Sequence, residues 1–173
     1  MFDRAFAGLM LGDGTGEWVR VLRRVAAASE MPRSWPAFCA PLEEVVDEQV
    51  LSAEKLDRWR ATSLEAAEVL GRFRGVSGET ATDIDELALA CRLNALMGER
   101  FAISRRLAGQ GGVPDAGLAQ RLARFAQMCE DAIPEYEAAW LARHKPSGLR
   151  EVTAVFQRLA GQARAIAGKL REA

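Results

Sequence analysis

The chain of 173 residues is poor in the side chains that most metal and catalytic sites require. It contains one histidine, His144, and three cysteines, Cys39, Cys91 and Cys129, which lie far apart and form no Cys-x-x-Cys pair. This spacing indicates neither a disulfide framework nor a zinc site. A single histidine also cannot supply the two Glu-x-x-His pairs of a di-iron bundle. We therefore expect no metal and no cofactor, and we expect Cys91 and Cys129 to be small core residues.

The chain also lacks an excess of charge of one sign and any long apolar run. Its formal net charge is −1, which argues against nucleic-acid binding because phosphate recognition needs a basic excess. The apolar stretch at residues 5–11 contains Gly8 and is too short for a membrane span and poor as a signal sequence. These features predict a cytoplasmic protein, or an internal part of a larger one, without nucleic-acid or membrane partners.

What remains is an ordinary globular composition with an uneven distribution of charge. Apolar residues make up 49% of the chain and charged residues 27%, which suits one folded domain and argues against disorder. Between residues 43 and 86 acids outnumber bases by twelve to five, whereas bases outnumber acids between residues 100 and 171. Two interpretations stay open: solvated helix faces that partly complement one another, or a charged docking surface for a neighbouring domain.

Apolar periodicity predicts two long helices in the C-terminal half. The last one carries apolar residues at steps of three and four, as expected for a helix that packs within a bundle: Leu149, Val152, Phe156, Leu159, Ala163, Ile166 and Leu170. The preceding helix is expected to begin after Pro114 and to bury Leu118, Leu122, Phe125, Cys129, Ile133, Tyr136 and Trp140. Pro134 lies inside this pattern, so we expect a kink or a break near Asp131.

Capping signals predict the helices of the first half. Ser52 is expected to cap a helix that carries Leu56, Trp59, Ala66, Leu70 and Phe73, and the sequence from Thr82 to Asp85 resembles a capping box for a helix that continues to Leu107. Thr15 is placed to cap a helix over residues 16–28, after which Pro32, Pro36 and Pro41 indicate an irregular connector. The predicted fold class is an all-α bundle of about five or six helices with long antiparallel helices in the C-terminal half. We expect a single domain in which residues 1–51, irregular with a short helix, pack on a bundle of residues 52–173.

Two local motifs suggest chemistry, but each has a structural explanation. The glycine-rich turn at residues 12–17 lacks the Lys-Ser/Thr ending of a P-loop and the ligand number of a calcium loop, so a turn before the Thr15 cap is favoured. The acidic pair Asp85-Glu86 is expected in the first turn of a helix, where it stabilises the helix dipole. Among the tryptophans, Trp18, Trp59 and Trp140 fall on apolar stripes, whereas Trp35 lies between prolines and is the best surface aromatic.

A helical corner carries the strongest family resemblance. In the run Trp140-Leu141-Ala142-Arg143-His144-Lys145-Pro146-Ser147-Gly148-Leu149, basic residues follow an apolar stripe, Pro146 stops one helix and Ser147 is placed to cap the next. With the preceding Glu135-Tyr136-Glu137-Ala138-Ala139, this segment resembles the helices that follow the catalytic barrel in some bacterial glycoside hydrolase family 20 (β-N-acetylhexosaminidase-like) proteins. In that family, Asn and Gly commonly stand where this chain has His144 and Ser147. The resemblance extends from Ser52 to Ala163, with decreasing strength outside the corner.

The resemblance implies a non-catalytic accessory domain that packs on a catalytic barrel or supports a homo-oligomer. The barrel's Asp-Glu motif is absent, so no catalytic residue carries over, and we expect no enzyme activity of this chain alone. The expected partner contacts are Trp35, Arg143, His144 and Lys145. The alternative is a free-standing helical adaptor that binds another protein through a groove or a charged patch, and an enzyme with a polar pocket is a third possibility.

Overall fold

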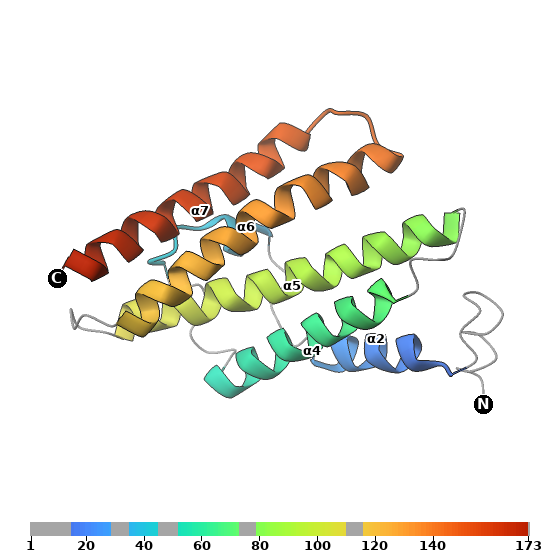
Figure 1. Cartoon of the computed structure of the whole chain (residues 1–173), viewed down its shortest axis with the longest axis horizontal. Coiled ribbons are helices and arrows are strands. Elements are labelled where there is room, and N and C mark those ends of the chain that lie inside the picture. Colours follow the sequence, from blue (N-terminus) through green and yellow to red (C-terminus); the bar gives the residue numbers. More distant parts are fainter. Residues whose placement is uncertain (1–14, 29–34, 45–51, 73–78, 110–115, 173) are drawn as a thin grey trace.

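The computed structural model of the chain describes residues 15–28, 35–44, 52–72, 79–109 and 116–172. These residues form six helices and no strand: α2 (Glu17–Ala28), α3 (Trp35–Cys39), α4 (Ala53–Gly71), α5 (Glu79–Gly109), α6 (Ala116–Arg143) and α7 (Leu149–Glu172). The predicted all-α bundle is therefore confirmed, including the two long antiparallel helices of the C-terminal half (Figure 1).

Two helical hairpins, the added helix α2 and the short helix α3 make up the described part of the bundle. Helix α4 packs along α5, α6 packs along α7, and α5 lies beside α6 and joins the two hairpins (Figure 1). Helix α2 packs against α4 at the edge of the bundle. Helices α5 and α6 contact one another less extensively than the two helices within either hairpin do.

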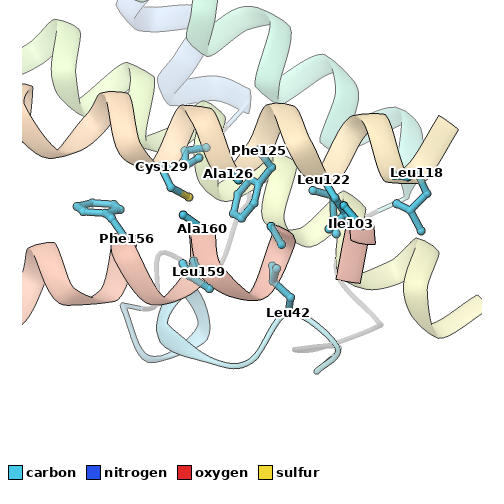
Figure 2. Close-up of a cluster of buried hydrophobic side chains, with 14 of the residues drawn as sticks. Leu42, Ile103, Leu118, Leu122, Phe125, Ala126, Cys129, Phe156, Leu159 and Ala160 are labelled. Carbon is cyan, nitrogen blue, oxygen red and sulfur yellow. The ribbon is translucent and has the colours of Figure 1, made fainter. Parts of the chain in front are cut away.

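Three clusters of buried side chains hold the helices together, and α5 contributes to each of them. The largest joins α3, α5, α6 and α7, and Figure 2 shows Phe125, Cys129, Phe156 and Leu159 at its centre. The second joins α2, α4 and α5 through Val21, Leu70, Ile84, Ala88 and Cys91, among others. The third places Ala37, Leu56, Trp59 and Phe101 between α3, α4 and α5. The predicted apolar seam of α7 is confirmed, because Phe156, Leu159 and Ala163 are buried.

Helix α6 begins at Ala116, as predicted from Pro114, and two of the four predicted capping residues, Ser52 and Thr15, agree with the structure. The Ser52 hydroxyl accepts a hydrogen bond from the Lys55 N–H at 3.2 Å, and the Thr15 hydroxyl accepts one from the Glu17 N–H at 3.2 Å. The prediction of a capping box at Thr82 is wrong, because α5 already begins at Glu79 and Thr82 lies inside it. Consequently Asp85 and Glu86 lie beyond the first turn, and their predicted role at the helix terminus is also wrong.

The corner between α6 and α7 differs from its prediction in detail. Helix α7 starts at Leu149, and the Val152 N–H bonds to the carbonyl of Gly148, so Gly148 and not Ser147 occupies the capping position. Gly148 has a φ of 81°, a left-handed conformation that favours glycine. Of the kink or break predicted near Asp131, the break is wrong, because α6 continues through Pro134 to Arg143, and the kink stays a prediction.

Some predicted features lie outside the described residues. These are Phe73, the side chain of Trp18, the apolar stretch at residues 5–11, and the start of the glycine-rich turn at residues 12–14. The other two tryptophans predicted for the core differ from one another. Trp59 is buried, at 2% exposure, whereas Trp140 is half-buried.

A buried ion-pair network ties three helices together beside Trp59. Glu99 of α5 is 5% exposed and receives two hydrogen bonds from Arg121 of α6, at 2.6 and 2.9 Å, and a third from Arg60 of α4. Burial raises the pKa of Glu99, but the hydrogen bonds and charges of Arg121 and Arg60 outweigh it and hold the pKa below its usual value. Glu99 is thus the anion through which α4 and α6 are fixed to α5.

A second buried arginine holds the short helix α3. The guanidinium of Arg100 is fully buried, and its Nη2 donates to the carbonyls of Ala40 and Pro41 at 3.1 and 2.9 Å. Arg158 of α7 donates to the carbonyl of Cys39 at 2.6 Å. Two arginines from different helices therefore bind the carbonyl end of α3. Burial lowers the pKa of Arg100, and the charge of Glu44 opposes that change.

Candidate interaction groove

A surface groove runs along the boundary between the two hairpins. It comprises three adjoining hollows of about 520, 260 and 430 Å³, and all three are lined by Arg92 of α5. The first two hollows also share Glu135 of α6, and the last two share Leu64 of α4. Because neighbouring hollows share walls, we treat them as one site, the α4–α5–α6 groove.

Each helix presents one stripe of residues to this groove, spaced at three and four positions as one helical face requires. Helix α5 provides Thr82, Asp85, Glu86, Leu89, Arg92 and Leu96. Helix α6 provides Met128, Asp131, Ala132, Glu135, Ala138, Ala139 and Ala142. Helix α4 provides Leu64, Ala67, Glu68 and Gly71. Alanine and glycine are frequent in these stripes, and small side chains leave room between the helix backbones.

One ion pair crosses the groove and another closes its end. The Arg92 Nε lies 2.6 Å from the Glu135 carboxylate, which links α5 to α6 between the first two hollows. At the C-terminus of α6, Arg143 pairs with Asp83 and Glu86 of α5, at 2.6 Å for Glu86. The hydrogen bond that Arg143 donates to the Asp83 carboxylate raises the pKa of Arg143 above its usual value, so Arg143 stays charged at neutral pH. These pairs fix the width of the groove at two points.

The lining of the groove carries an excess of negative charge. Its acidic residues are Glu68, Asp85, Glu86, Asp131 and Glu135, and Arg92 is its only base among the described residues. Glu68, Glu86 and Glu135 each face an arginine. Asp85 makes no ion pair within the described part of the chain, and Asp131 accepts a hydrogen bond only from the neutral amide of Gln127, at 2.8 Å. One uncompensated carboxylate thus lies in each of the first two hollows.

The four residues predicted as partner contacts do not form one surface. Trp35 is 45% exposed on α3, where its ring stacks on Phe38 with centroids 5.6 Å apart. Arg143, His144 and Lys145 are all exposed at the end of α6, and only Arg143 reaches the acids beside the groove. The Lys145 carbonyl accepts a hydrogen bond from the Trp140 indole, which braces the corner. Their role as contacts stays a prediction.

The groove residues themselves were not predicted as a site. A sequence signal was present, since Ala132, Glu135, Ala138, Ala139 and Ala142 recur at helical spacing and place small residues beside an acid. This stripe flanks the buried face of α6 that contains Leu122 and Phe125, and it overlaps that face at Ala132, which packs against the first cluster. A helix with a second, small-residue face is a sign of a second packing surface.

The cysteines have the predicted structural role. Cys91 and Cys129 are buried, and burial raises the pKa of Cys129 to about 12 and also raises that of Cys91. Both thiols are therefore protonated and unreactive near neutral pH. Among the described residues, no three side chains of the usual ligand types converge as a metal site would require.

No model of a known protein family, no curated protein and no solved structure matches this chain. The similarity to glycoside hydrolase family 20 at the α6–α7 corner accordingly stays a prediction. In the part of the chain that the structure describes, no helix is both long enough and apolar enough to cross a bilayer.

Proposed function

We propose that this chain is a helical interaction module that binds a partner protein through the α4–α5–α6 groove. The observation that carries the proposal is the groove itself: three adjoining hollows, lined by small and apolar residues and edged with carboxylates. Helix-in-groove recognition uses such surfaces, in which hollows take side chains of the bound helix. A catalytic barrel that rests on this face is one form that the partner can take.

Exposed apolar residues support a groove more than a broad docking face. In the part of the chain that the structure describes, the large apolar side chains with substantial exposure are Trp35, Leu64, Leu87 and Leu141, which belong to four different helices. An accessory domain that covers a barrel is expected to present one contiguous apolar face. An enzyme is expected to bring polar groups together in a concave pocket, whereas the five carboxylates here are spread over three helices and three hollows.

Site-specific photo-crosslinking in the source cells tests this function. The photoreactive residue p-benzoylphenylalanine replaces Ala138, which is exposed and lines the first hollow. The matched control replaces Ala154, an exposed alanine on α7 that does not line the groove. We expect Ala138 to give a covalent adduct with one partner protein, and we expect Ala154 to give none with it.

Mass spectrometry of the adduct identifies the attached peptide. A single partner segment attached at Ala138 supports the interaction module. Equal labelling at Ala138 and Ala154, or no protein adduct at Ala138 while the protein is folded and expressed, would rule out the groove as a binding site.

A further inference from the structure

Charge and shape together restrict what the groove can bind. Its lining carries five acids and one base, and Asp85 and Asp131 lack a cationic partner among the described residues. Both are exposed, on α5 and α6 respectively, so each can meet a charge from outside. An acidic partner would be repelled here, and a purely apolar one would leave the carboxylates unpaired.

The groove has the length of a short helix. The α6 stripe extends from Met128 to Ala142, which at a helical rise of 1.5 Å per residue corresponds to about 21 Å. A bound helix of about 14 residues, or four turns, covers that distance. The apolar parts of the hollows, among them Leu64, Leu89 and Met128, suit the apolar face of such a helix.

The same acidic hairpin already holds one helix of this kind within the chain. Helix α2 contains Arg20, Arg23 and Arg24 against the single acid Glu17, and its Val21 is buried against α4 and α5. Arg24 pairs with Glu65 of α4 at 3.3 Å. No described residue of α2 lines the three hollows, but its contact with α4 and α5 is an internal example of a basic amphipathic helix that packs on this hairpin and pairs with one of its acids.

We infer that the occupant of the α4–α5–α6 groove is a basic amphipathic helix of a partner protein. Its apolar residues enter the hollows on either side of the Arg92–Glu135 pair, and its lysine or arginine side chains pair with Asp85 and Asp131. The inference deepens the proposed function and rests on it, because it names the chemistry of the segment that the groove binds.

Two synthetic peptides test the inference by fluorescence anisotropy with the full chain. Both are helical peptides of about 16 residues with leucine and alanine on one face, and the polar face is lysine in one and glutamate in the other. We expect the lysine peptide to bind at least about tenfold more tightly than the glutamate peptide, and we expect added salt to weaken its binding.

Three variants place the binding in the groove. Asp85→Asn combined with Asp131→Asn is expected to lower the affinity for the lysine peptide about tenfold, since each exposed ion pair contributes about threefold to affinity. Ala138→Trp fills the first hollow and is also expected to lower the affinity for the lysine peptide. The charge-matched control, Glu151→Gln combined with Glu172→Gln on α7, is expected to change affinity less than about twofold. Thermal unfolding monitored by circular dichroism checks that each variant is folded.

The remaining outcomes each contradict the inference. Absence of binding by the lysine peptide, equal binding of both peptides, or an effect of the α7 control as large as that of the groove variants would overturn it. A homodimer in sedimentation analysis that Ala138→Trp dissociates would assign the groove to a second copy instead. If the peptide test fails but crosslinking at Ala138 still captures a single partner segment, the proposed function holds and only the inferred basic helix is wrong.

Discussion

Glu99→Gln is expected to lower the free energy of unfolding by about 3 kcal/mol near neutral pH. The substitution removes the anion that Arg121 of α6 and Arg60 of α4 share, and the side chain of Arg121 is only 19% exposed. Breaking a buried ion pair on one side costs about 3–5 kcal/mol because the other charge stays buried without a partner. Partial access of Arg60 to water places the expected value at the lower end of that range.

Chemical denaturation at constant temperature measures the loss, and a thermal scan should show the midpoint lowered by about 6–12 °C for a chain of this size. Glu68→Gln is the matched control. Glu68 forms an exposed pair with Arg72 within α4 and is expected to contribute less than about 0.5 kcal/mol. Equal effects of the two substitutions would mean that the Glu99 network does not bind the helices together.

The difference in unfolding free energy between wild type and Glu99→Gln depends on pH, and this dependence gives a second test. The folded pKa of Glu99 lies below its ordinary value of 4.5, so the folded state binds fewer protons than the unfolded state in this range. The stabilisation is therefore fully present above pH 4.5 and is lost as the pH falls through the folded pKa. We expect the two proteins to converge in stability only under those acidic conditions. If the difference in unfolding free energy grew as the pH fell, the ionised carboxylate of Glu99 would not be the stabilising group.

The sequence predicts those parts of the fold that depend on local periodicity. The stripe from Leu149 to Leu170 alternates steps of three and four, so one face of α7 is apolar and its partner must be another helix. Ser52 is likewise a local signal, since the N–H that it caps lies three residues away. The error at Thr82 has a local cause too: a side chain of capping type followed by acids also occurs within the first turns of a helix, as it does in α5.

The ion-pair network and the groove depend on contacts between distant residues. Arg60 and Glu99 lie 39 residues apart, and Glu99 and Arg121 lie 22 apart, so no spacing rule brings them together. The groove lies between α4, α5 and α6, which belong to two different hairpins, so it depends on the relative placement of the hairpins. From the sequence alone, Arg143 was predicted as a contact for a partner, whereas in the structure its ion pairs are with α5 of the same chain.

Gly98 of α5 lies directly against the ring of Trp59 of α4, and its importance could not be predicted from helix propensity. Glycine is unfavourable inside a helix by about 0.8–1 kcal/mol relative to alanine, so Gly98→Ala would ordinarily stabilise α5. A Cβ at this position, however, would lie 2.7 and 2.9 Å from two ring carbons of Trp59. The ring is 2% exposed and enclosed by Leu56 and Phe101, so it has no free space into which to move.

Gly98→Ala is therefore expected to destabilise the protein by about 2 kcal/mol. Overpacking a core costs about 1–3 kcal/mol, and the tight contact with a confined ring favours the upper end, which exceeds the gain in helix propensity. Gly161→Ala on α7 is the matched control, since a Cβ there meets nothing within 4 Å and should stabilise the protein by up to about 1 kcal/mol. Chemical denaturation of both variants measures these opposite signs.

A double-mutant cycle separates the clash from any other effect of the new methyl group. In a Trp59→Leu background the ring is gone, so Gly98→Ala should lose its cost and show the same sign as Gly161→Ala. The shorter side chain destabilises the third cluster by itself, but that loss is common to both members of the comparison. Persistence of the full penalty in the Trp59→Leu background would show that contact with Trp59 is not its cause. The cycle thus measures directly how far the packing of α4 on α5 depends on glycine at position 98.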